Sequence, residues 1–251
     1  SSACPATGDM VAVNGDCRVT PSTFQTQIYE IGLCTAHPYG AAKTSATFDA
    51  STCVVIYTDA APAAVDLAAT IGTNTTLPGT ASAPSEGTYG FPYIKLGTDF
   101  TVAGSFTNTP TGGVATTYYS RSNGTVGTTA PAVAKTDSLK NFGNTDCSSG
   151  YVGAAVVGGT MDGFITNTAF TRSIDTDKSG NPVICNKSDR LVAVMNLAAP
   201  FTVTSQTYAV NFNFILTNYG GQFVDGNDGD RIPEEFASAP FAGYFTVLNA
   251  D

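Results

Sequence analysis

The sequence contains little of what nucleic-acid-binding and membrane-spanning proteins need. It has no tryptophan, and 12% of its residues are charged, compared with about 25% in a typical globular protein. Its formal net charge is −9 and it has no basic run, which disfavours partners that offer phosphates to lysine and arginine. No apolar stretch approaches the roughly 20 residues of a membrane-spanning helix. We therefore expect no nucleic-acid partner and no transmembrane segment.

Catalytic motifs are also scarce. The single histidine, His37, lies in the stretch CTAHPYG, and the chain has neither a GxSxG motif nor a nucleotide-binding glycine loop. We interpret His37 as a surface loop residue beside a disulfide. Two carboxylates can hydrolyse a glycosidic bond, but glutamates are few and the tryptophan that often stacks on sugars is absent. The sequence therefore assigns no catalytic residue.

The cysteines indicate an exported protein. They are Cys4, Cys17, Cys34, Cys53, Cys147 and Cys185. None forms a CxxC pair, and one histidine cannot complete a usual Cys/His zinc site. An even number of cysteines, an acidic threonine-rich composition and the lack of an initiator methionine predict three disulfides and a location outside the cell or on its surface, after signal-peptide removal. We favour pairs of sequence neighbours, because each would close a hairpin or loop.

Apolar residues alternate with period two along most of the chain, which is typical of β-strands. The clearest hairpin signal is Asn14-Gly15, between alternating apolar residues. The predicted strands lie within residues 10–20, 27–35, 52–58, 93–106, 115–120, 151–159, 161–170, 190–198, 208–218 and 242–250. Residues 59–72, DAAPAAVDLAATIG, are the one stretch with the composition of a helix.

These elements predict an all-β fold. About ten short strands separated by turns favour a jelly-roll-like β-sandwich that is stapled by disulfides. Residues 72–90, 107–116 and 121–136 are polar and are predicted to be long loops. We expect one domain over residues 1–251, with at most one or two short helices. A boundary near residue 80 or near residue 140 is the less favoured alternative.

A first acidic loop lies in DTDKSGNPVICN. Asp175, Asp177, Ser179 and Gly180 occupy positions 1, 3, 5 and 6 of an EF-type calcium loop, where alternate side chains turn toward the cation and glycine allows the sharp bend. Position 12 is Asn186 instead of the bidentate glutamate. The segment is either a weak calcium site, completed by ligands from another segment, or a polar hairpin.

A second acidic loop lies in FVDGNDGDRIPEEF. Its candidate ligands for a metal ion are Asp225, Asn227, Asp228, Asp230 and Glu234. Crowded oxygen ligands repel each other without a cation, and ligand sets made only of oxygen favour Ca²⁺. We expect flanking strands to hold the loop, with Phe223 and Phe236 as apolar anchors. A solvated bend is the alternative.

Within that stretch, DGNDGDRIPEEF resembles the acidic calcium loops of thrombospondin type 3 and dockerin modules. The resemblance covers these twelve residues alone. Asp225 and Asn227 fit the first and third positions of those loops, whereas Gly229 and Asp230 stand in the reverse of the usual order. The resemblance implies a structural calcium ion.

The C-terminal stretch FAGYFTVLNAD is apolar on both faces of the predicted strand. One face carries Phe241, Phe245 and Val247, and the other carries Tyr244 and Leu248. Such a strand is either central in its own sandwich, which we favour, or inserted into a neighbouring subunit. Exposed strand edges pair readily with another chain, so these residues are the candidate assembly strand.

Sequons for N-glycosylation occur at Asn74, Asn123 and Asn186. They carry glycans only if the chain is a secreted eukaryotic protein.

Three functions remain, in decreasing order of preference. The first is a structural subunit that polymerises with copies of itself through strand edges into a filament, sheath, surface layer or virion surface, with Ca²⁺ as a stabilising ion. The second is a calcium-dependent module that binds glycans or acts as an adhesin. The third is a carboxylate hydrolase.

Overall fold

The computed structural model describes residues 2–5, 7, 10, 15–109, 112–139, 151–172, 188–226 and 232–250. These residues fold almost entirely into β-strands. No helix in this part of the chain is longer than a 3₁₀ turn, as at Ala50–Thr52 and Ala68–Thr70, and none is long and apolar enough to span a membrane. The prediction of an all-β fold is confirmed.

The largest sheet contains seven strands, each antiparallel to its neighbours. Its order is β15 (Tyr151–Val156), β16 (Gly159–Thr166), β17 (Arg190–Leu197), β9 (Phe91–Gly97), β4 (Ile28–Cys34), β5 (Cys53–Thr58) and β7 (Thr80–Ala81). The central strands β17 and β9 are largely buried, because β-branched and aromatic side chains suit a pleated surface that is covered on both faces. β15 and β7 lie at opposite edges of this sheet.

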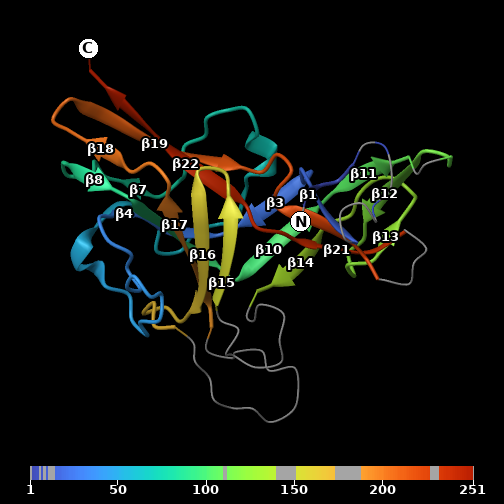
Figure 1. Ribbon diagram of the computed structural model, residues 1–251, viewed down its shortest axis with the longest axis horizontal. Coiled ribbons are helices and arrows are strands. Elements are labelled where there is room, and N and C mark those ends of the chain that lie inside the picture. Colours follow the sequence, from blue (N-terminus) through green and yellow to red (C-terminus); the bar gives the residue numbers. More distant parts are fainter. Residues whose placement is uncertain are drawn as a thin grey trace, which may run out of the picture.

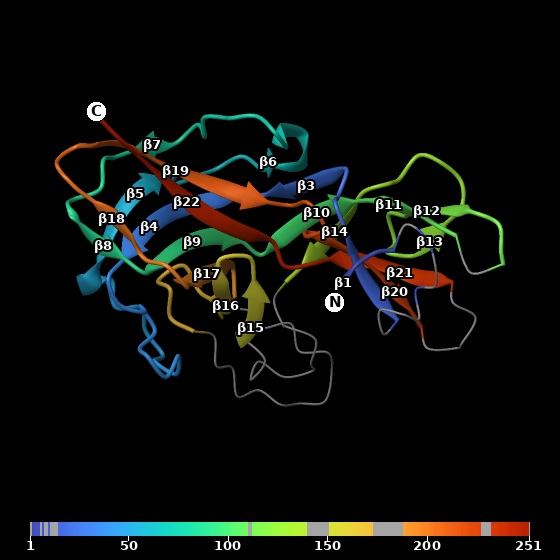
Figure 2. The ribbon, with the colours of Figure 1, turned by 45° about the horizontal axis from the view of Figure 1, so that its top comes forward.

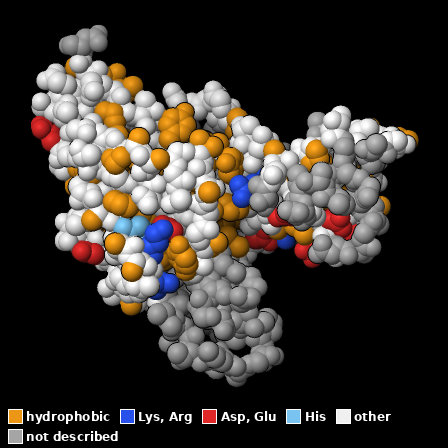
Figure 3. Space-filling model, viewed as in Figure 1, with side chains coloured by type: hydrophobic (Ala, Val, Ile, Leu, Met, Phe, Trp, Pro, Cys, Tyr) orange, Lys and Arg blue, Asp and Glu red, His pale blue; other side chains and the backbone are white. Residues whose placement is uncertain are grey.

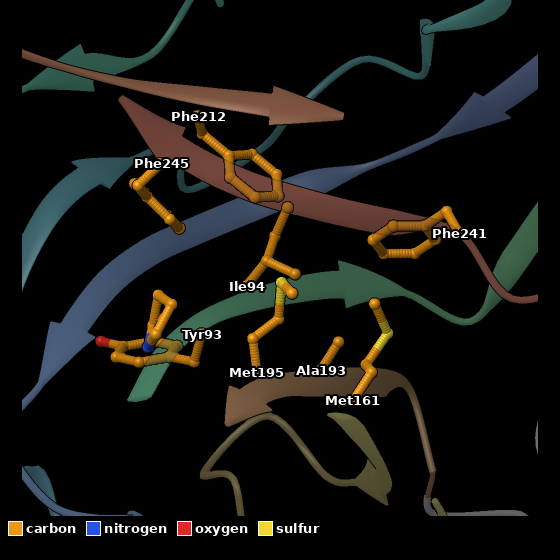
Figure 4. Close-up of a pocket in the computed structure, with 9 residues that line it drawn as sticks. Tyr93, Ile94, Met161, Ala193, Met195, Phe212, Phe241 and Phe245 are labelled. Carbon is orange, nitrogen blue, oxygen red and sulfur yellow. The ribbon is translucent and has the colours of Figure 1, made fainter. Parts of the chain in front are cut away.

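A two-stranded ribbon forms a second layer. β19 (Thr207–Ile215) and β22 (Ala242–Asn249) pair in antiparallel fashion, and Figure 2 shows them crossing over the seven-stranded sheet. Phe212, Phe241 and Phe245 point from the ribbon toward Ile94 and Met195 in the sheet (Figure 4). Where these side chains meet the sheet, the remaining cavity is about 10 Å³, so the two layers are closely packed at this point, as in a sandwich.

Smaller sheets extend the molecule away from the ribbon, on the right of Figure 1. One contains β14 (Lys135–Ser138), β10 (Asp99–Ala103), β3 (Thr23–Thr26) and β6 (Val65–Asp66). Another contains β1 (Ser2–Ala3), β2 (Asp16–Val19), β20 (Gly221–Asp225) and β21 (Pro233–Ser238). A third contains β11 (Ser105–Asn108), β12 (Thr116–Ser120) and β13 (Val126–Gly127). The pair β18 (Phe201–Val203) and β8 (Gly87–Tyr89) lies instead beside the ribbon, on the left of Figure 1.

Most predicted strands are confirmed with shifted ends. Residues 93–106 form parts of three successive strands, β9, β10 and β11, rather than one. Gly15 has a φ of 76°, as the predicted Asn-Gly turn requires, while Asn14 lies outside the described residues. The prediction of a single domain, with its alternative boundaries near residues 80 and 140, stays a prediction.

The predicted helix at residues 59–72 is wrong. This segment contains β6 and the 3₁₀ helix Ala68–Thr70. The carboxylate of Asp66 accepts hydrogen bonds from the backbone N–H groups of Phe24 and Ala68, and the N–H of Leu67 donates to the carbonyl of Phe24. Pairing with β3 therefore outweighs the helix propensity of the alanines, which is a weak preference.

Two of the three predicted disulfides are confirmed. Cys4 pairs with Cys17 at the start of β2, and Cys34 pairs with Cys53 directly across the β4–β5 ladder. The third predicted pair, Cys147 with Cys185, lies outside the described residues. Each observed bond closes a short stretch of chain, which limits the conformations of the unfolded state.

Replacing both Cys34 and Cys53 by alanine removes the bond that joins β4 to β5 and closes a separation of 19 residues. We expect the free energy of unfolding to fall by roughly 2–5 kcal/mol. Chemical denaturation of the oxidised wild type and of the double variant measures this difference. An unchanged denaturation midpoint would show that the disulfide does not restrict the unfolded chain.

Candidate functional site

A groove of about 780 Å³ lies between the ribbon and one edge of the seven-stranded sheet. One wall is residues 210–217, from β19 and the turn after it, and the opposite wall is residues 70–77. The floor comes from β4, β5, β7 and the segment before the 3₁₀ helix, through Ile31, Ile56, Tyr57, Leu67 and Ala81. The groove is thus built between two segments of extended or turning chain.

The wall formed by residues 210–217 presents a strand edge to the groove. Every residue of this run lines it. Because successive side chains of a strand point to opposite faces, a complete consecutive run lines a groove when the backbone edge itself faces it. β19 pairs with β22 along its other edge. Within the described residues, no strand pairs with the edge that faces the groove.

The groove contains no charged side chain, although the chain has a formal net charge of −9. Its floor is mainly aliphatic, and its rim carries threonine and asparagine side chains from both walls. The six strand residues of this wall, 210–215, span about 20 Å. The groove therefore suits an elongated, uncharged ligand that can form backbone hydrogen bonds with β19.

The residues of the candidate assembly strand lie in or just before β22, within the subunit's own ribbon. Phe241 and Phe245 pack into the core between the layers, and Val247 and Leu248 are half-buried in β22. Tyr244 is 47% exposed and is the β22 residue that lines the groove. The strand is therefore not buried on both faces. β19 and β22 are both edge strands of the ribbon, and the edge that faces the groove belongs to β19.

The sequence carries a signal for the solvent-exposed face of β19, which our sequence interpretation missed. In VNFNFI, Asn211 and Asn213 alternate with apolar residues, which is typical of a strand with one covered and one open face. Asn211 is exposed, and the side-chain amide of Asn213 donates to the hydroxyl of Thr246 on β22. The asparagines thus mark the solvent side of the ribbon.

The acidic loop at residues 223–236 is held as predicted by two strands. Phe223 in β20 faces Phe236 in β21, and both are fully buried with ring centroids 4.9 Å apart. Asp225 ends β20 and is buried, and Glu234 in β21 accepts a hydrogen bond from the N–H of Gly226. Strand pairing thus brings two of the candidate metal ligands to the same end of the hairpin.

The other candidate metal ligands lie outside the described residues. They are Asn227, Asp228, Asp230, Asp175, Asp177 and Ser179. The described part of the chain contains no group of three His, Cys, Asp or Glu side chains that could hold a metal ion. The calcium sites stay predictions.

A second cluster surrounds His37, which is 8% exposed, so its assignment to the surface is wrong. The backbone N–H of Tyr39 donates to His37 Nδ1, and His37 Nε2 lies 3.5 Å from the carboxylate of Asp162. That carboxylate also contacts Lys43 Nζ at 2.8 Å and accepts a hydrogen bond from the hydroxyl of Tyr151. The cluster joins the turn at residues 37–43 to β15 and β16.

Burial lowers the pKa of His37 because the charged ring would lose its water, and the nearby Asp162 carboxylate opposes this effect only in part. Nδ1 accepts a hydrogen bond, so the proton of the neutral ring is on Nε2 and points toward Asp162. Protonation of Nδ1 would break the bond from Tyr39. The geometry thus holds His37 as a neutral anchor of the turn.

A buried lysine lies in the centre of the large sheet. Lys95 in β9 contacts the carboxylate of Glu30 in β4 at 2.7 Å, and the hydroxyl of Tyr93 donates to the same carboxylate. Lys95 Nζ also lies 3.0 Å from the centre of the Phe170 ring. Burial lowers the pKa of Lys95, and the Glu30 carboxylate opposes the shift. A lysine inside the apolar run YIKLG was the available sequence signal for such a pair.

Comparisons of the chain with protein-family models, with curated proteins and with solved structures gave no match. The function therefore has to be inferred from the chemistry of the groove and of the two buried polar clusters.

Stability should depend on the protonation of His37. In the unfolded chain His37 titrates at about pH 6.5, whereas in the folded protein its pKa is lowered. Protons therefore bind preferentially to the unfolded state as the pH falls, and the stability present above about pH 6.5 should decrease as the pH falls below that value and through the lowered pKa of the folded state. Urea denaturation at several pH values measures this decrease.

The variant His37→Gln serves as the control, because its side chain keeps a donor and an acceptor but does not titrate. Since the chain has one histidine, the variant should lose the decrease in stability over this interval. A wild type and a variant with the same pH dependence would contradict the role of His37.

Proposed function

We propose that this chain is a structural subunit of an extracellular assembly, which joins to copies of itself through the edges of β-strands. The observation that carries the proposal is the edge of β19 that faces an uncharged groove. Unpaired backbone groups along such an edge form a template for a strand from another chain.

The composition of β19 supports this proposal. Monomeric β proteins commonly protect an edge strand with a charged residue, a proline or a very short length. β19 spans nine residues, TYAVNFNFI, and includes neither a charge nor a proline. The edge is therefore long and chemically unprotected, which favours pairing with another strand.

The surface chemistry agrees with a building block. Figure 3 shows that charged side chains are sparse on the face viewed in Figure 1 and that most of this face is apolar or neutral. In the described residues several charges are taken up by internal pairs, as in Lys95 with Glu30 and Lys43 with Asp162. Low charge weakens electrostatic repulsion between copies that approach each other. The disulfides fit an oxidising environment, so we place the assembly outside the cell.

A module that binds glycans is the second candidate. Threonine and asparagine side chains on the rim of the groove can hydrogen-bond sugar hydroxyls, and Tyr57 and Tyr244 line the same groove. We rank this function lower, because a glycan would leave the backbone groups of the β19 edge without strand partners.

Calcium is proposed to stabilise the β20–β21 hairpin, since the two strands bring Asp225 and Glu234 to the same end of it. We expect millimolar Ca²⁺, but not Mg²⁺, to raise the thermal unfolding midpoint by a few degrees. The variant Glu234→Gln should remove most of this rise in differential scanning fluorimetry. An unfolding midpoint that does not change with Ca²⁺ would contradict the calcium proposal. It would not affect the proposal that concerns the groove.

Assembly should be blocked by a charge in the groove. Ile71 lines it and is 46% exposed, whereas Val114 is 83% exposed and belongs to the turn between β11 and β12. Both positions tolerate lysine without a buried charge. We expect wild type and Val114→Lys to form polymers, which negative-stain electron microscopy and sedimentation detect. For Ile71→Lys we expect the polymerised fraction to be at least ten-fold lower.

Two outcomes would count against the function. If the wild type stays monomeric at high concentration, the subunit hypothesis is wrong. If instead an oligosaccharide from a glycan array binds the wild type and Ile71→Lys abolishes that binding, the second candidate replaces it.

A further inference from the structure

A second unprotected edge lies on the opposite side of the large sheet. β15 (Tyr151–Val156) is the outermost strand there and pairs with β16 as its one strand neighbour in the described residues. Its sequence, YVGAAV, has neither charge nor proline, and Tyr151 and Val152 are each 38% exposed. An exposed, uncharged edge of this kind favours pairing with another strand.

From these two edges we infer that β15 of one copy pairs with the open edge of β19 in the groove of a second copy. This inference rests on the proposed function and names the segment that fills the groove. Neither the groove lining nor the β15 run itself contains a charged residue, in a chain with a net charge of −9. They also match in chemistry, since each offers strand backbone groups beside apolar side chains.

The small residues of β15 suit the groove. Gly153, Ala154 and Ala155 form the middle of the strand, and their short side chains allow its backbone to approach β19 closely. Six residues of β15 span about 20 Å, which matches the six β19 strand residues that line the groove.

The position of the two edges determines the kind of assembly. β15 begins the order of the seven-stranded sheet, whereas the floor of the groove includes residues of β5 and β7 at its end. Figure 2 shows β15 on the side of the molecule opposite to β5, β7 and β19. A contact between different surfaces on opposite sides is heterologous, and such contacts generate open filaments or rings rather than closed dimers.

Cross-linking between two variants, each with one added cysteine, tests this inference. One variant carries Val152→Cys on β15 and the other carries Asn211→Cys, at an exposed position of β19 in the groove. Neighbouring strands lie about 4.8 Å apart, so a short bismaleimide can join them on either face. We expect the mixture to form covalent heterodimers at least ten-fold more efficiently than either variant alone.

The matched control replaces Val152→Cys by Val114→Cys, a more exposed valine that lies away from both edges. This mixture, and wild type alone, should give background cross-linking. Circular dichroism of each variant confirms that it is folded before mixing.

Other cross-linking patterns overturn the inference. Efficient cross-linking of Asn211→Cys with itself would indicate that two β19 edges pair in a symmetric dimer, and the same result for Val152→Cys would indicate paired β15 edges. If polymers form but the mixture gives only background, another segment fills the groove and the proposed function still stands. If no polymers form, the proposed function itself fails.

Discussion

The contact between the aromatic side chains of the ribbon and the large sheet determines most of this architecture. Phe212, Phe241 and Phe245 cover the sheet at Ile94 and Met195 and leave a cavity of only about 10 Å³ there. Aromatic pairs such as Phe212 with Phe245 add about 0.5–1.5 kcal/mol each beyond the burial of their area. Because this packing holds β22 over the sheet, β19 comes to lie at the outer side of the ribbon, with its free edge along the groove.

Several charged residues form ion pairs in or near the interior of the protein. In the described part of the chain, Lys95 with Glu30 and Lys43 with Asp162 lie in or near the interior and tie strands or turns together. Removing one partner of a buried pair would leave an uncompensated charge at a cost of several kcal/mol. The charges thus specify the fold, while the groove and β15 remain neutral and suited to contact with another copy.

Period-two patterns were enough to predict the strands of the large sheet, since β4, β5, β16 and β17 alternate or run apolar as buried strands do. The pairs Cys4–Cys17 and Cys34–Cys53 were predicted because a bond between neighbouring cysteines closes a hairpin or loop. Long-range effects were not predictable in this way. Asp66 converts an alanine-rich segment into a strand and turn through its bonds to β3, and Asp162 draws His37 into the interior. Neither partner is close in sequence, so local patterns carry no sign of the contact.

Local sequence patterns also could not predict which strand edge stays open. The sequence indicated an apolar strand at residues 242–250, but its apolar face is used within the subunit. Which edge stays open depends on how the ribbon packs, and that is a property of the tertiary structure.

The central claim is that the groove edge of β19 accepts a strand from another copy. Hydrogen exchange, measured by mass spectrometry on dispersed and assembled protein, tests it without any mutation. The account predicts that amides in residues 210–217 and 151–156 become protected on assembly, while those of the buried β17 change little. Assembled protein in which residues 210–217 exchange as fast as in the dispersed subunit would contradict it.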